Sequence, residues 1–220
     1  MIQNVVDYDR EAMRQLTDPT TYKILTLQQY ETQLREAHTE ILDAAITLQR
    51  YGHITKNELE AIREAPLKGS TAYFLPKIHK PPNEESKTCP GRPIMATHSC
   101  VMRLADKLLT EWTGPLLKLI GGSLMDTTDL LKKLPKGSLP STTTVTTADV
   151  DSLYPSIPHE RGIKASIQFY EENLDYLREE CEKRNLLPPP EPAQFGRLLE
   201  AVLNNSLIHF KNRFWVRQIK

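Results

Sequence analysis

The sequence has no excess of charge of either sign, because its 28 lysines and arginines balance its 28 aspartates and glutamates. A chain without net charge has no global field to attract a polyanion, so a nucleic-acid site would have to be local. The sequence also has no apolar run near the about 20 residues that cross a bilayer, and its N-terminus lacks the apolar region of a signal peptide. We therefore expect an intracellular protein, nuclear or cytoplasmic, without a membrane partner.

Cysteines are also few, and the three present, Cys89, Cys100 and Cys181, are far apart. An odd number of cysteines without a C-x-x-C pair argues against a disulfide framework and a zinc site, and favours a reducing compartment. Hydrophobic residues make up 39% and charged residues 25% of the 220 residues, which is ordinary for a globular protein. This length suffices for one large domain or two small ones with a sizeable core.

Residues 1–66 have the pattern of a helical N-terminal segment. Apolar side chains recur at steps of three or four between Leu27 and Arg50, which predicts one face of a helix. Thr26 and Gln29 match a capping box, and Gly52 stands where a glycine often ends a helix. The segment holds eleven acidic and seven basic residues, a net charge of −4. It is therefore not expected to bind a polyanion.

Residues 67–98 have a different character. The stretches "TAYFL" (71–75) and "RPIMA" (92–96) are short β-type runs, and proline and polar residues fill the space between them. This arrangement predicts two strands joined by a long exposed connection. Five basic residues stand against two acidic ones in residues 68–92, a net charge of +3. Positive charge is therefore concentrated on this hairpin.

Residues 99–220 mix helical patterns with short strands. A strand is expected at about 143–149, and "LIHFKNRFWV" alternates around Lys211–Asn212 as a hairpin does. From Leu207 onward there are four basic residues and no acid. Strands interleaved with helices, after material predicted to be helical only, indicate an α+β fold. Helices are expected near residues 99–114, 126–134, 158–174 and 193–205.

Asp149 and Asp151 follow the β-type run "STTTVTT" in the stretch "TADVDSLYPSIP". A strand interior normally excludes Asp, so acids at its end either form a turn or begin a helix, or they bind a metal ion. Mg²⁺ is a hard cation that favours one or two carboxylates together with substrate phosphates. The spacing of the two acids alone does not decide between a turn or helix start and a metal site.

Lys77 in "FLPK" and Arg92 in "GRPI" stand at the end and the beginning of the two predicted strands. In a hairpin they would lie close together, where two cations are unfavourable unless an anion lies between them. A triphosphate would satisfy both charges. The alternative is a solvated hairpin with scattered charge.

Taken together, "YFLPKIHKP", "GRPIMA" and "TTADVDSLYPSIPHERGI" resemble the reverse transcriptase domain of Penelope-like retroelements, and more distantly telomerase. The stretches "DREAMRQLTDPTTY" and "LLEAVLNNSLIHFKNRFWVRQ" are similar to the same family in the same order. The resemblance therefore covers nearly the whole chain. It implies an RNA-directed DNA polymerase acting on an RNA template, a DNA primer and deoxynucleoside triphosphates.

The resemblance also implies a fold and roles for residues. The chain would comprise the fingers hairpin at 67–98 and, at 99–220, the fingers helices with an incomplete palm of a right-hand polymerase. Asp149 would be the catalytic acid and a ligand of two Mg²⁺ ions, with the carbonyl of Val150 as a further ligand. The resemblance assigns nucleotide binding to Lys77, Arg92 and Tyr154, the last by excluding a 2′-hydroxyl, with Asp151 and Lys80 as further candidates. We expect Lys77 and Arg92 to face one cleft that Asp149 borders.

The family continues with a glycine-containing motif and an x-x-D-D strand that holds the remaining catalytic carboxylates. Because neither motif stands in this sequence, we expect a polymerase fragment that is inactive alone. The alternative is a non-catalytic remnant of a reverse transcriptase that serves as a nucleic-acid or protein binding module. A purely structural helical adaptor is disfavoured by the polymerase motifs.

Overall fold

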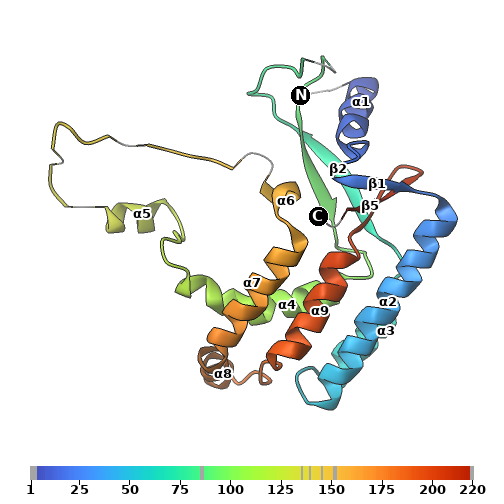
Figure 1. Cartoon of the computed structure of the whole chain (residues 1–220), viewed down its shortest axis with the longest axis vertical. Helices are drawn as coiled ribbons and strands as arrows, with labels where there is room; N and C mark the ends of the chain where they lie inside the picture. Colours follow the sequence, from blue (N-terminus) through green and yellow to red (C-terminus); the bar gives the residue numbers. More distant parts are fainter. Residues whose placement is uncertain are drawn as a thin grey trace.

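In the computed structural model, helices surround one mixed five-stranded sheet, so the α+β expectation is confirmed (Figure 1). Among the described residues, no helix is both long enough and apolar enough to cross a membrane. The structure describes residues 4–84, 87–134, 136–138, 140–144, 146–150 and 153–218.

The strand order in the sheet is β1-β5-β4-β2-β3. The β2–β3 and β4–β5 pairs are the two hairpins expected from the sequence, and β1 adds to β5 antiparallel. The two hairpins join through β2 and β4, which are parallel and pair only at Ser70–Ile208 and Thr71–His209. The strands are β1 (Tyr22–Leu25), β2 (Ser70–Pro76), β3 (Gly91–Ala96), β4 (Leu207–Phe210) and β5 (Arg213–Arg217).

The predicted helices are present close to the expected positions. The described helices are α1 (Val5–Leu16), α2 (Leu27–Arg50), α3 (Lys56–Arg63), α4 (Arg103–Thr113), the 3₁₀ helix η1 (Gly114–Leu119), α5 (Thr127–Lys133), α6 (Leu153–Ser156), α7 (His159–Glu172), α8 (Leu174–Lys183) and α9 (Pro192–Asn204).

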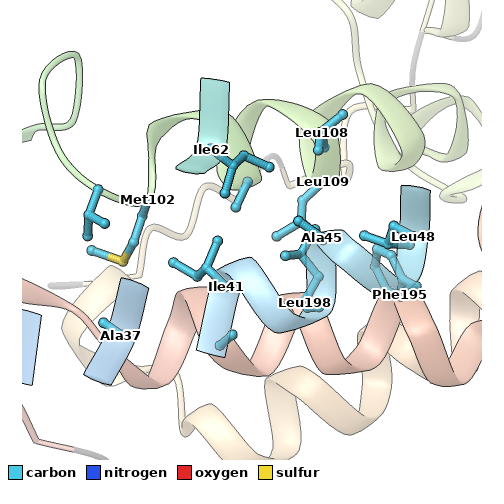
Figure 2. Packing of buried hydrophobic residues seen from close by; sticks show 14 of the residues in the cluster. Ala37, Ile41, Ala45, Leu48, Ile62, Met102, Leu108, Leu109, Phe195 and Leu198 are labelled. Atoms are coloured by element: carbon cyan, nitrogen blue, oxygen red, sulfur yellow. The ribbon is translucent and has the colours of Figure 1, made fainter. Parts of the chain in front are cut away.

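The long helix α2 forms as its sequence predicts. Thr26 and Gln29 make the reciprocal capping box, and Gly52 follows the helix with φ +79°, a conformation that glycine adopts without strain. Its apolar face packs against α3 and α9 in the larger of two hydrophobic cores, to which α4 also contributes (Figure 2). Members labelled in Figure 2 are Ala37, Ile41, Ala45, Leu48, Ile62, Met102, Leu108, Leu109, Phe195 and Leu198.

A second, smaller core lies on the other face of the sheet, under α1. Ala12 and Leu16 of α1 pack there on strand residues, and the largest of these, Trp215, is 1% exposed. The strand residues of this core are Ala72, Phe74, Ile208, Phe210 and Trp215. The sheet is therefore covered by α1 on one face and, around β1, β4 and β5, by the larger core on the other.

Two expectations about secondary structure were wrong, and one helix was not predicted. Residues 1–66 are not only helical, because Tyr22–Leu25 forms β1; four residues are too few to show a period, and pairing with β5 makes them a strand. Helix α8 was not expected from its mostly charged sequence. The described residues of 143–149 form no strand, because no described strand runs beside them to complete a ladder.

Candidate functional site

The β2–β3 hairpin brings Lys77 and Arg92 together. Arg92 lies opposite Leu75, and the N–H of Lys77 donates to the carbonyl of Pro90 at 2.8 Å, which extends the pairing one residue beyond β2. Lys77 and Arg92 are thus diagonal neighbours across the two strands, at positions about 7–8 Å apart. Residues two apart on a strand point to the same face, so both side chains belong to the face of Leu75.

This face of the hairpin is open. Tyr73 is 40% and Leu75 48% exposed, whereas Ala72 and Phe74 on the opposite face are each 4% exposed under α1. Arg92 is exposed and Lys77 is half-buried. One aromatic ring, aliphatic side chains and two cations therefore share an accessible surface at the end of the sheet.

Lys80 lies in the turn that follows β2. Its N–H donates to the carbonyl of Lys77 at 2.9 Å, and its side chain is exposed. The backbone therefore keeps Lys80 within one turn of Lys77, although it belongs to no strand.

The start of β3 is held by α1, a support that was not predicted. Glu11 is 2% exposed and accepts the N–H of Gly91 at 3.0 Å, while Gln15 donates to the carbonyl of Gly91 at 2.8 Å. Burial raises the pKa of the Glu11 carboxyl, but hydrogen bonds from Arg14, Gly91 and Gln15 and the Arg14 charge outweigh it, so the pKa is lowered. The sequence signal for this role is weak: Glu11 only borders the apolar residues of α1.

Asp149 and Val150 lie in a different environment. Both are exposed and lie in a non-helical segment, where Oδ1 of Asp149 accepts the N–H of its neighbour Val150 at 3.0 Å. Within the described part of the chain, no hydrogen bond or ion pair joins Asp149 to Lys77 or Arg92. Their convergence on one cleft stays a prediction.

Two further candidates are described incompletely. Asp151 lies outside the described residues. Tyr154 belongs to α6, but its side chain lies outside what the structure describes.

The stretch of chain that follows Asp149 contacts the sheet at β5. The Arg217 guanidinium donates to the carbonyl of Ile157 at 3.2 Å. His159, the first residue of α7, is 5% exposed, and burial together with the nearby Arg217 charge lowers its pKa. The chain from Asp149 to α7 is therefore attached to the sheet within eight residues of Asp149.

The described residues of 117–150, which precede this attachment, extend away from the sheet and the helices around it (Figure 1). Every described residue of 117–150 except Asp129 is exposed. Many of these residues are apolar, with Met125 76% and Leu131 64% exposed. Packing within the described part of the chain therefore does not explain why this segment has so many apolar residues.

The described residues include no cluster of three or more His, Cys, Asp or Glu side chains able to hold a metal ion. Asp149 offers one free carboxylate oxygen at an accessible position, since its Oδ1 accepts the N–H of Val150. Mg²⁺ is commonly held by one or two carboxylates and substrate phosphates, and a single carboxylate fits that donor set only in part. Further ligands would have to come with the substrate or from other carboxylates.

No protein-family model matches the chain, and no curated protein or solved structure matches it either.

Proposed function

We propose that this chain forms the fingers and the beginning of the palm of an RNA-directed DNA polymerase similar to those of Penelope-like retroelements. The observation that carries the proposal is the pairing of Lys77 and Arg92 on one open face of the β2–β3 hairpin. Two cations held next to each other by backbone pairing favour an anion with several charges. The motif order in the sequence points to a nucleoside triphosphate as this anion.

In this proposal Lys77 and Arg92 bind the phosphates of the incoming deoxynucleotide, with Lys80 within reach of the same end of the sheet. Arg92 can present a planar, bidentate donor to phosphate, whereas Lys77 acts as a point charge. Tyr73 and Leu75 form the apolar floor beside them. Such a combination of ring, aliphatic surface and positive charge is also suited to a nucleic-acid strand.

Asp149 is proposed as the metal-binding acid, with the carbonyl of Val150 beside it and Tyr154 against the sugar. The chemistry that bound Mg²⁺ supplies in such a site is activation of the primer 3′-hydroxyl and neutralisation of the triphosphate charge. The attachment of Ile157 to Arg217 limits how far Asp149 can lie from the sheet. Rigid placement matters here because phosphoryl transfer is catalysed mainly by positioning and charge stabilisation.

A second candidate function is a non-catalytic binding module for nucleic acid or protein. The exposed apolar residues of 117–157 favour it, because patches of this kind often mark interaction surfaces. The two candidates differ in what the hairpin face recognises: a triphosphate in the first, and only a macromolecule in the second.

The test is equilibrium binding of a Mg²⁺–deoxynucleoside triphosphate to the purified chain, with the unphosphorylated nucleoside for comparison. We expect Arg92→Ala and Lys77→Ala each to weaken triphosphate binding about tenfold or more, since a hydrogen bond to a charged group contributes about 1.5–3 kcal/mol. Lys107→Ala is the matched control, because Lys107 is an exposed lysine of α4 that pairs with Glu111. Absence of triphosphate binding, or equal affinities for all variants, would contradict the polymerase proposal.

A further inference from the structure

Helix α1 lies where the two hairpins of the sheet diverge. β2 and β4 pair at Ser70 and Thr71 only, and further along β2 the N–H of Phe74 donates to the hydroxyl of Tyr8 at 3.0 Å. The Tyr8 ring also contacts the rings of Phe74 and Phe210, one from each hairpin, with centroids 6.3 and 6.1 Å away. Tyr8 therefore takes the place of a strand partner between the hairpins.

One turn further along α1, Glu11 and Gln15 hold the first residue of β3. Oε1 of Glu11 accepts the N–H of Gly91 and also the side-chain amide of Gln15, at 2.7 Å, and that amide donates to the Gly91 carbonyl. Arg14 donates to both carboxylate oxygens of Glu11, at 2.9 and 3.0 Å. Both backbone polar groups of Gly91 are therefore fixed by side chains of α1.

The contact leaves little room for a side chain at this position. A Cβ at Gly91 would lie 3.2 Å from the Cβ of Phe74 and 3.4 Å from the Cγ of Glu11. A buried carboxylate at such a place is unfavourable unless it is fully paired, and hydrophobic residues of similar volume often stabilise as well or better. Global stability is thus a weak explanation for an acid here, whereas fixing one backbone position is a specific one.

Gly91 is followed directly by Arg92, and Pro90 before it accepts the N–H of Lys77. We propose that Glu11 and Gln15 are positioning residues, which fix the Gly91 backbone so that Arg92 and Lys77 are held in register to bind a polyphosphate. This inference rests on the proposed function for the identity of the ligand, but its structural part does not. Neither Glu11 nor Gln15 contacts the ligand.

The first test is binding of inorganic tripolyphosphate to the full chain and to Glu11→Gln, Gln15→Ala, Arg92→Ala and the double variant Glu11→Gln/Arg92→Ala. Asp7→Asn is the matched control, because Asp7 is a partly exposed acid of the same helix with an i,i+3 arginine, Arg10. We expect Glu11→Gln and Gln15→Ala to weaken binding several-fold and Asp7→Asn to leave it unchanged. The loss in the double variant should be smaller than the sum of the losses in Glu11→Gln and Arg92→Ala, since Glu11 acts in part through Arg92.

The second test measures amide hydrogen exchange at Gly91 and Arg92 by NMR. We expect exchange at these two amides to rise at least tenfold in Glu11→Gln while β4 and β5 keep their protection. Unchanged exchange there overturns the positioning role, whatever the binding data are. Faster local exchange without tripolyphosphate binding by any variant supports the positioning role and overturns the triphosphate site itself. Should Glu11→Gln not fold, Gln15→Ala, which leaves the Glu11–Arg14 pair intact, decides both tests.

Discussion

At the scale of single residues, the best-defined polar group near the hairpin is the Glu11 carboxylate rather than the candidate catalytic acid. Glu11 is 2% exposed and has Arg14, Gln15 and the Gly91 N–H as partners, all within one helical turn or on β3. Asp149 is exposed and bonds to its own neighbour. A carboxylate that serves structure is paired within the fold, whereas one that serves a metal must be left accessible.

The lowered pKa of Glu11 predicts a pH dependence of stability. Because the folded protein holds the pKa of Glu11 below its ordinary value of 4.5, the unfolded chain binds the proton more readily. The stabilisation is complete above about pH 4.5 and is lost as the pH falls through the folded pKa. We expect the free energy of unfolding of the wild type to fall more steeply than that of Glu11→Gln between about pH 5 and 3.

Urea denaturation of both proteins across this pH range measures the difference. Other carboxylates, Asp129 and Glu160 among them, titrate equally in both and cancel. Parallel pH profiles would show that the Glu11 network is not formed in solution.

At the scale of elements, the β2–β3 and β4–β5 hairpins are joined next to Gly69, where there is no room for a further side-chain atom. The N–H of Gly69 donates to the Tyr30 hydroxyl at 2.9 Å, so the start of β2 is tied to α2. Tyr30 in turn stacks on Phe214 of β5, with ring centroids 4.4 Å apart. One tyrosine therefore connects α2, β2 and β5.

We predict that Gly69→Ala destabilises the fold by about 1–3 kcal/mol, the usual range for an overpacked site. A Cβ at this position would lie 2.6 Å from the carbonyl oxygen of Leu207 and 2.8 Å from the Tyr30 hydroxyl. The backbone atom cannot move aside without breaking the β2–β4 junction. Gly121→Ala is the control, because nothing lies within 4 Å of its Cβ position.

Urea unfolding of both variants measures this effect. Gly121→Ala should change the free energy of unfolding by no more than about 1 kcal/mol. A loss for Gly69→Ala as small as that of the control would show that β2 and β4 are not packed together in this way.

At the scale of the whole molecule, a well-packed body carries a long exposed segment. The sheet and the helices around it have two cores, while the described residues of 117–150 are almost all exposed. The only candidate catalytic carboxylate that the structure describes, Asp149, stands at the end of that segment. Two-metal catalysis needs carboxylates anchored on more than one element.

We therefore predict that the 220-residue chain does not extend a primer by itself. Primer extension with Mg²⁺ should stay at background for the chain alone and rise when a separately expressed palm segment with the remaining carboxylates is added. Asp149→Asn should abolish this activity at unchanged thermal stability, since substitutions at exposed positions usually change stability by less than about 0.5 kcal/mol. Incorporation by the chain alone would overturn the fragment interpretation.

Local patterns in the sequence were sufficient for much of the fold. The cap at Thr26, the amphipathic face of α2 and the alternation about Lys211–Asn212 depend on neighbours within a few residues, so they could be recognised directly. The adjacency of Lys77 and Arg92 followed from the same kind of local pairing.

Only the tertiary structure decided which distant segments meet. Tyr22–Leu25 is a strand because β5 lies beside it, and the described residues of 143–149 form no strand because no described partner lies beside them. The role of Glu11 depends on Gly91, 80 residues away in the chain. Spacing identifies residues that share a face of one element, but only the packing of elements against each other determines which polar groups of different elements meet.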